Sequence, residues 1–295
     1  MSVGARAREQ LAKRAPRLEE VAVRAHWRRR NRGRAFAVAA IQDSKQRALV
    51  ETLAKNGYAV CSFEELFHDA GLFDEAAERA GRLYDARVQP QPAAEGSKET
   101  FLQKLAAGTF DADHPFVRIA LHSAALNVAN GYLRMRSTLR ALELWWTRPT
   151  GGEAVQTQLW HKDADDVMNL KMFVYFTDVT RGAGPLTYAP RTHPLGPRRS
   201  SVAHDADHRS TDQQLARLVP EREWAILEGK PGTVVFADTC GYHKQLKPRA
   251  DERVKLVAQY VSGTPYVPNA LRLSRVDPTA LTEDQHYAVF DRPPS

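Results

Sequence analysis

The sequence is poor in cysteine and has no long hydrophobic run. Its two cysteines, Cys61 and Cys240, can form at most one bridge, which excludes a disulfide scaffold and favours a reducing, cytoplasmic location. No hydrophobic stretch approaches the roughly 18 residues that a membrane-spanning helix needs. The N-terminus is positively charged but lacks the apolar segment of a secretory signal. A glycine-rich phosphate loop after a strand and a βαβ alternation are also missing, which disfavours a nucleotide-binding fold.

Acidic residues are scarce in one part of the chain, an N-terminal arm of residues 1–34. The arm holds eleven lysines and arginines against three glutamates, whereas the other 261 residues hold 31 basic against 32 acidic side chains. The formal net charge of +7 therefore belongs to the arm, and the body is close to neutral. We expect the arm to be a weak helix, interrupted by proline, that ends in a solvated cluster from Trp27 to Arg34; as a tail it is either disordered or lies on the surface. A neutral body argues against nucleic acid as a partner.

Hydrophobic spacing divides the body into two halves. Apolar residues recur three or four apart over 44–57 and 72–88, and again in one long helix that begins near Pro115 and continues to Tyr132. From about residue 142 onward the pattern changes to short β-favouring runs separated by glycine and proline. These runs cover residues 144–147, 155–160, 170–178, 185–189, 233–237 and 253–261.

Several short strands at this spacing predict an α+β fold with a sandwich or barrel of the jelly-roll kind, and with the helices of the N-terminal half packed outside it. We expect a single domain over residues 35–295. Within it, residues 35–141 form a helical support, residues from about 142 to 263 form the core, and residues 264–295 form a C-terminal tail.

Three potential metal ligands follow predicted strands. His161 and Asp163 come directly after the strand 155–160, and His243 comes after the strand 233–237. Residues i and i+2 of an extended chain point to the same side, so His161 and Asp163 can bind one ion together. Two histidines and one carboxylate on one face are the ligand set of non-haem Fe(II) oxygenases. Spacing alone leaves the alternative that these histidines lie at the surface or serve as hydrogen-bonding groups.

Arg253 opens the last β-favouring run. An arginine buried at the start of a core strand needs an anionic partner, because an unpaired buried charge is costly. Its planar guanidinium suits a carboxylate held by two hydrogen bonds. The 5-carboxylate of 2-oxoglutarate, whose other end chelates iron, would be such a partner. The alternative is a solvent-facing position on the strand.

Four separated segments resemble, in the same order, the motifs of the phytanoyl-CoA dioxygenase family, over roughly residues 140–262. The segments are 158–163, 170–179, 184–193 and 232–243 together with Arg253. The resemblance implies a double-stranded β-helix core of the jelly-roll, cupin-like type that uses Fe(II), 2-oxoglutarate and O₂. It assigns His161, Asp163 and His243 to iron and Arg253 to 2-oxoglutarate.

The resemblance also implies a lysine from the helical half near the cosubstrate, for which Lys98 and Lys104 are the candidates. Phe173 and Tyr175 share a strand face, and they either line the cosubstrate pocket or belong to the core. Gln245 stands where the family often has a small residue, so we expect different contacts beside 2-oxoglutarate.

The implied reaction is hydroxylation of an unactivated C–H bond of a small-molecule metabolite, with release of succinate and CO₂. Candidate substrate contacts are Gln156, Gln158, Trp146 and Asp166, although strand alternation directs about half of such residues away from any pocket. The segment 194–222 is rich in arginine and histidine. It is either an entrance lid that attracts an anionic or carrier-linked substrate, or a solvated insertion. The family does not fix the substrate.

Two other functions stay open at this stage. One is a catalytically silent jelly roll that binds metal, or a protein that docks onto a partner through its basic arm. The other is a Zn(II) hydrolase, which Arg253 and the Gly184-Pro185 pair disfavour. No pattern in the sequence encodes the oligomeric state.

Overall fold

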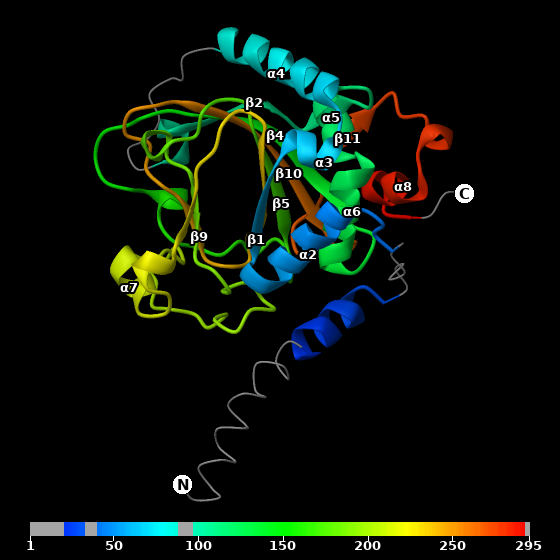
Figure 1. Ribbon diagram of the computed structural model, residues 1–295. Helices are drawn as coiled ribbons and strands as arrows, with labels where there is room; N and C mark the ends of the chain where they lie inside the picture. Colours follow the sequence, from blue (N-terminus) through cyan, green and yellow to red (C-terminus); the bar gives the residue numbers. More distant parts are fainter. Residues whose placement is uncertain (1–20, 33–39, 88–96, 293–295) are drawn as a thin grey trace, which may run out of the picture.

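The computed structural model describes residues 21–32, 40–87 and 97–292, which form a mixed helix and sheet fold (Figure 1). A six-stranded sheet is the centre of the molecule. Helices cover one of its faces, and a three-stranded sheet lies on the side of the other face. This arrangement confirms the predicted combination of helices and sheet, with helices flanking the sheet.

Eleven strands have regular pairing in the described residues. They are β1 (Tyr58–Ser62), β2 (Leu102–Ala107), β3 (Thr109–Asp111), β4 (Thr138–Thr147), β5 (Leu170–Tyr175), β6 (Leu186–Tyr188), β7 (Ala225–Leu227), β8 (Thr233–Asp238), β9 (His243–Gln245), β10 (Arg253–Val261) and β11 (Arg272–Ser274). The large sheet has the order β1-β8-β5-β10-β4-β2 and the small sheet the order β7-β6-β9. Both are antiparallel, and β3 and β11 form a separate parallel pair.

Helices come mainly from the N-terminal half. They are α2 (Ser44–Asn56), α3 (Phe63–Phe67), α4 (Ala70–Asp85), α5 (Pro115–Ala120), α6 (Ser123–Leu133), α7 (Asp212–Ala216) and α8 (Glu283–Phe290). The Asp43 side chain accepts a hydrogen bond from Gln46 N at the start of α2, and Gly57 ends the helix in the left-handed region at φ 87°. None of the described helices is long and apolar enough to span a bilayer.

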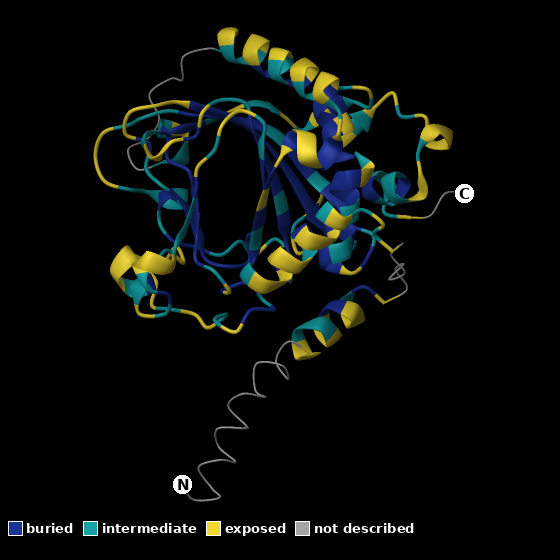
Figure 2. Cartoon of the chain, in the orientation of Figure 1, coloured by how far each residue is buried: buried dark blue, intermediate teal, exposed yellow. Residues whose placement is uncertain are grey.

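The central strands β4, β5, β8 and β10 are mostly buried on both faces, whereas the edge strands β1 and β2 carry exposed residues (Figure 2). Side chains alternate between the two faces along each strand. On β5, Met172 and Val174 belong to the core that the sheet forms with the helices. Phe173 and Tyr175 point the other way and belong, with Tyr188 of β6, to an inner core between the two sheets. Polar side chains on this inner face are therefore enclosed between the sheets.

The predicted long helix from Pro115 to Tyr132 is wrong in its continuity. The structure has two helices, because the chain is extended at His122, with ψ 139°, and the His122 ring accepts a hydrogen bond from Ala124 N. The histidine thus caps a new helix.

The strand predicted over 155–160 is also wrong. Residues Gln156–Gln158 form a turn of 3₁₀ helix, and Trp160 makes a single antiparallel bridge to Ser210. The turn forms because the Gln158 side chain accepts a hydrogen bond from Val155 N at 3.0 Å. In addition, β2 extends one edge of the large sheet with residues from the region expected to be helical support.

Residues 21–32 are the described part of the N-terminal arm, and residues 21–30 of it are helical. Trp27 is buried, with 2% of its surface exposed, so the expectation of a solvated cluster around it is corrected. Arg30 donates a hydrogen bond to Thr264 O at 2.6 Å, and its guanidinium lies 4.1 Å from the centre of the Tyr266 ring. The end of the arm therefore packs on the body; the remainder, residues 1–20 and 33–34, lies outside the described residues.

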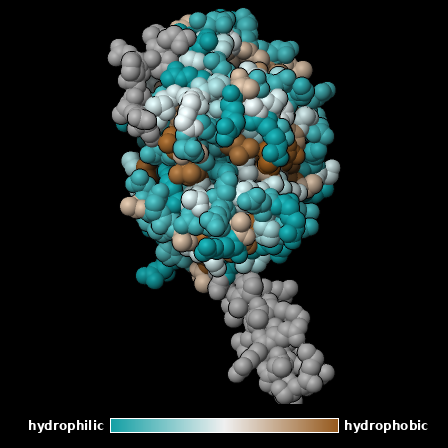
Figure 3. All heavy atoms as spheres, turned by 90° about the vertical axis from the view of Figure 1, so that its left-hand side faces the viewer, coloured by the Kyte–Doolittle hydropathy of each residue, from teal (hydrophilic) through white to brown (hydrophobic). Residues whose placement is uncertain are grey.

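Figure 3 turns the left-hand side of Figure 1 toward the viewer. Most of this face is hydrophilic, and hydrophobic atoms form small patches across its middle. The surface is thus mostly polar on the side of the small sheet and α7.

Candidate metal site

The three predicted metal ligands converge beside the inner core. His161 Nε2 lies 3.8 Å from Asp163 Oδ1, and His243 Nε2 lies 3.8 Å from Asp163 Oδ2. One ligand atom from each residue lies within 4.8 Å of the others. The two histidines are held together by a backbone bridge in which each N–H donates to the other's carbonyl at 3.0 Å. One ion can therefore contact all three side chains.

The orientation of both imidazoles suits a metal ion. His161 Nδ1 lies 2.9 Å from Leu159 O, and His243 Nδ1 lies 3.0 Å from Gly241 O. A carbonyl oxygen only accepts, so each Nδ1 carries the proton and each Nε2 presents its lone pair. Burial lowers the pKa of both histidines, which keeps them neutral at physiological pH. Neutral imidazoles with an oriented Nε2 are the form that binds metal.

Asp163, the third predicted ligand, forms an ion pair with Lys171. The lysine Nζ lies 2.7 Å from Asp163 Oδ2. Burial would raise the pKa of the Asp163 carboxyl, but Lys171 and the two histidines together outweigh burial and hold that pKa well below its usual range. The carboxylate is therefore ionised and fixed in orientation.

A small cavity of about 60 Å³ adjoins the three side chains. We call it the triad cavity. It is lined by Lys98, Trp145, Thr157, His161, Asp163, Lys171, Phe173, Leu186, His243 and Gln245. The wall thus combines the three predicted ligands with two lysines and an apolar surface, a composition suited to a small anionic molecule next to a metal ion.

Arg253 and Lys255 lie on the inner side of β10, next to this cavity. Arg253 is 1% exposed and donates a hydrogen bond to the side-chain oxygen of Gln245, while its Nε and Nη1 have no partner among the described residues. Lys255 Nζ is also buried without a partner in this part of the chain. Burial lowers the pKa of Arg253 to about 10, so the guanidinium stays charged at neutral pH. Burial and the neighbouring Arg253 lower the pKa of Lys255 well below its usual value, so the charge is clear for the arginine alone. Buried, unpaired donors of this kind fit a carboxylate.

Gln245 lines the triad cavity, whereas Arg253 does not. The Gln245 side chain therefore contacts Arg253 and also forms part of the cavity wall. The expectation that Gln245 changes the contacts beside 2-oxoglutarate stays a prediction.

The two candidate lysines lie in different places. Lys98 lines the triad cavity, with its Nζ 5.0 Å from the centre of the Trp145 ring. Lys104 is on β2 and pairs with Glu143 at 2.7 Å, with 48% of its side chain exposed. Geometry therefore favours Lys98 over Lys104 as the lysine near the cosubstrate.

The two aromatic residues of β5 share the inner face of the strand, as expected, but only Phe173 lines the triad cavity. The Tyr175 hydroxyl donates a hydrogen bond to Leu227 O at 2.9 Å, deeper in the inner core. Tyr175 is therefore a core residue, and its assignment to the cosubstrate is corrected.

The four predicted substrate contacts do not line the triad cavity. Trp146 lies on the opposite face of the sheet and donates to Glu252, because odd and even residues of β4 point to opposite sides. Asp166 is buried and accepts hydrogen bonds from the backbone and hydroxyl of Ser262. Substrate contacts of Trp146 and Asp166 are therefore corrected.

Gln156 and Gln158 belong to the 3₁₀ turn. Gln158 is buried and holds that turn, and Gln156 has a positive φ of 51°. The neighbour between them, Thr157, is the residue of this turn that lines the triad cavity.

The sequence reasoning missed Lys171, Leu186 and Thr157. For Lys171 a signal was present, because it lies two residues before Phe173 and so shares its strand face. Trp145 is likewise placed at the cavity by the alternation that excludes Trp146.

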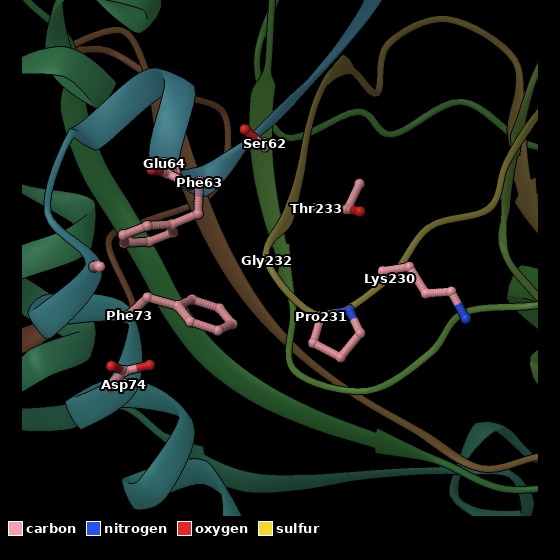
Figure 4. A pocket seen from close by; sticks show the side chains of 10 residues that line it. Ser62, Phe63, Glu64, Phe73, Asp74, Lys230, Pro231, Gly232 and Thr233 are labelled. Atoms are coloured by element: carbon pink, nitrogen blue, oxygen red, sulfur yellow. The ribbon is translucent and has the colours of Figure 1, made fainter.

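A second hollow lies away from these residues, where α3 and α4 meet the turn before β8 (Figure 4). It has a volume of about 330 Å³ and is lined by Phe63, Phe73 and Pro231, with the charged side chains of Asp74 and Lys230 at its edge. It contains none of the predicted site residues. The triad cavity therefore remains the candidate site.

The chain is similar to one known protein family in sequence and to several solved structures in fold. The family model described as phytanoyl-CoA dioxygenase (PhyH) matches residues 53–245. No curated protein matches the sequence.

Similar solved structures include the epimerase SnoN in complex with Fe³⁺, alpha ketoglutarate and nogalamycin RO, at a TM-score of 0.55 and 18% identity over 77% of this chain and 88% of that chain. EctD from S. alaskensis in its apoform has a TM-score of 0.54 and 18% identity over 82% of this chain and 91% of that chain. EctD with 2-oxoglutarate and 5-hydroxyectoine has a TM-score of 0.54 and 20% identity over 89% of this chain and 88% of that chain. At these identities the likeness is one of fold.

Proposed function

This chain belongs to the phytanoyl-CoA dioxygenase family, and we propose that it is an Fe(II)- and 2-oxoglutarate-dependent dioxygenase acting on a small molecule. The observation that carries the proposal is the convergence of His161, Asp163 and His243 beside the buried, unpaired donor groups of Arg253 and Lys255. The histidines supply neutral nitrogen ligands and the aspartate supplies an ionised oxygen, which is the donor set of this class of iron site.

The core of the proposed enzyme is a double-stranded β-helix. Two antiparallel sheets packed across the inner core support this proposal. The site lies at the small sheet, where β9 carries His243 and a backbone bridge adds His161.

His161, Asp163 and His243 would hold Fe(II) and leave coordination positions for 2-oxoglutarate and O₂. When bound, iron and cosubstrate supply the oxidation, in which O₂ and 2-oxoglutarate convert a substrate C–H bond to C–OH and yield succinate and CO₂. The residues of the chain do the positioning. Backbone carbonyls fix both imidazoles, and Lys171 keeps Asp163 ionised and in place.

Arg253 and Lys255 would neutralise the 5-carboxylate of the cosubstrate. Their unpartnered N–H groups are already buried, so a carboxylate arriving there replaces no competing ion pair of the described residues. Lys98 adds positive charge at the cavity wall. Phe173 and Leu186 form apolar parts of the wall and limit the access of water to the reacting atoms.

Activity after anaerobic purification tests this function. Protein reconstituted with Fe(II) should release succinate from 2-oxoglutarate slowly when no substrate is added. In a screen of metabolites, the substrate should be the compound that makes this release faster. His161→Ala and Asp163→Ala should lose the iron-dependent release, whereas the exposed His204 offers a matched control in His204→Ala. Near-normal succinate release in both site variants would refute the ligand assignment. Bound metal without succinate release would indicate a silent metal-binding protein, and hydrolysis supported by Zn(II) would indicate a hydrolase.

A further inference from the structure

Arg209 belongs to the segment that leads into α7 and that pairs with the chain just before His161 (Figure 1). Trp160 and Ser210 form an antiparallel bridge, with N–O distances of 3.1 and 2.8 Å in the two directions. In an antiparallel pair the next residue on one chain opposes the preceding residue on the other, so Arg209 comes opposite His161. Directly opposed residues project from the same face. The Arg209 side chain therefore starts on the face from which His161 reaches the site.

The positive charge of Arg209 is uncompensated. Arg209 is half-buried although residues 203–208 before it are exposed. Its Nε is buried without a hydrogen-bond partner, and the described residues provide no ion pair for its guanidinium. Arg198 in the same segment, by contrast, pairs with Glu223 at 2.5 Å. The charge of Arg209 also contributes to lowering the pKa of His161 and His243, which agrees with its position beside them.

The chain connects Arg209 and Arg253 to His243 by different paths. Along β9, His243 leads to Gln245, which contacts Arg253. Across the strands, one bridge joins His243 to His161 and a second joins Trp160 to Ser210, the neighbour of Arg209. A carboxylate at Arg253 would then leave Arg209 for a second anionic group.

We propose that Arg209 binds an oxyanion of the primary substrate, either a carboxylate or a phosphate, and so positions the substrate beside the metal. The inference rests on the proposed function and makes it more specific, because it restricts the substrate to acids and phosphoesters. A guanidinium next to the ligands would hold the anionic end of such a molecule by paired hydrogen bonds and leave its carbon chain toward the site.

Small anions test the proposal without knowledge of the substrate. The protein is loaded with Mn(II), saturated with 2-oxoglutarate, and titrated with inorganic phosphate and, in a second arm, with acetate. Paramagnetic broadening of the phosphorus or methyl resonance reports binding near the metal. The variants are Arg209→Gln, Arg209→Lys and, as a matched control from the same segment, Arg198→Gln.

We expect saturable broadening in the wild type and in Arg198→Gln. Affinity should fall about tenfold or more in Arg209→Gln, which is the effect of losing charge-assisted hydrogen bonds, and recover in part in Arg209→Lys. Preferential binding of phosphate indicates a phosphoester, and preferential binding of acetate indicates a carboxylic acid. Equal affinity in Arg209→Gln, or no saturable binding in the wild type, overturns the proposal.

Calorimetry separates this test from the proposed function. If 2-oxoglutarate does not bind the Mn(II)-loaded protein, the proposed function fails. The phosphate titration is then repeated by calorimetry on metal-free protein, where binding that depends on Arg209 supports the anion site and binding that does not depend on it refutes the site.

Discussion

Lys171 Nζ lies 2.7 Å from Asp163 Oδ2, so an ammonium group from β5 stands beside the carboxylate that is predicted to bind the metal. Burial opposes the charge on both groups, yet each holds the other ionised: the pKa of Asp163 is lowered and the pKa of Lys171 is raised. Without a metal ion, Lys171 is thus the main positive charge that the aspartate faces. This makes the pair a sensitive point for both stability and metal binding.

Lys171→Met should destabilise the metal-free protein and make it depend on metal. The Lys171 and Asp163 side chains are only partly exposed, at 15% and 17%. Removing the lysine leaves the carboxylate without its partner, and we expect a loss of about 1 to 3 kcal/mol in the free energy of unfolding. Mn(II) replaces the missing positive charge, so the metal should raise the melting temperature of the variant more than that of the wild type. Thermal unfolding with and without Mn(II) measures both effects.

Lys230→Met is the matched control, because Lys230 pairs with Asp178 at 3.1 Å on an exposed surface. Its stability should stay within about 0.5 kcal/mol of the wild type. An unchanged free energy of unfolding in Lys171→Met, or the same stabilisation by Mn(II) in variant and wild type, would contradict the role of Lys171.

Gln245→Ala should strengthen the binding of 2-oxoglutarate. The glutamine accepts a hydrogen bond from Arg253 and lines the triad cavity, so it competes with a carboxylate for the same guanidinium. We expect the dissociation constant of 2-oxoglutarate on Mn(II)-loaded protein to fall by up to about tenfold, by calorimetry. Gln42→Ala, at an exposed position, should have no effect. Weaker binding in Gln245→Ala would mean that the glutamine itself holds the cosubstrate.

Lys255→Met should stabilise the protein against unfolding but weaken its binding of 2-oxoglutarate. Lys255 is buried without a hydrogen-bond partner, and its Nζ lies 4.7 Å from the centre of the Phe173 ring. Replacing it with an apolar side chain of similar size should raise the free energy of unfolding of the metal-free protein by about 1 to 3 kcal/mol. The same change should weaken the binding of 2-oxoglutarate about tenfold, because one buried hydrogen-bond donor is lost. A destabilised variant with unchanged 2-oxoglutarate binding would remove Lys255 from the site.

Asp238 should make the free energy of unfolding depend on pH. Burial raises the pKa of Asp238 to about 6, although the Tyr132 hydroxyl donates a hydrogen bond to it at 2.7 Å. The folded state therefore keeps a proton that the unfolded state releases near pH 4, so the contribution of Asp238 to stability falls as the pH rises from about 4 to 6. Relative to Asp238→Asn, the wild type should lose about 2 kcal/mol over this interval.

Chemical denaturation of the wild type and Asp238→Asn at several pH values tests this dependence. Comparing the two proteins cancels other titrating groups, among them the nearby His193, whose pKa burial lowers to about 4. A difference in unfolding free energy that does not change with pH would refute the raised pKa.

The three metal ligands could be predicted from the sequence because most of the evidence for them lies in short, local patterns. His161 and Asp163 are two residues apart, and the motif around His243 is recognisable from its own neighbours. The same local rule of strand alternation would have replaced Trp146 with Trp145 and added Lys171, once the register of β4 and β5 was known. The register itself was not readable from the sequence, since both faces of these strands are apolar.

Contacts between distant segments could not be predicted. The position of Arg209 opposite His161 depends on a single bridge between chain segments about fifty residues apart, and no periodicity encodes such a pairing. The hydrogen bond from Arg253 to Gln245 depends on how the end of β9 meets the start of β10. The break between α5 and α6 was missed because the cap at His122 is a histidine, which is not a usual helix-starting residue.

The central claim is that His161, Asp163 and His243 form one iron site that recruits 2-oxoglutarate. Anaerobic equilibrium titration tests it most directly. The account predicts one Fe(II) per chain, then one 2-oxoglutarate per bound Fe(II), no tight 2-oxoglutarate binding without metal, and loss of tight iron binding in Asp163→Ala. Iron bound as tightly by Asp163→Ala as by the wild type, or 2-oxoglutarate bound equally well with and without metal, would contradict it.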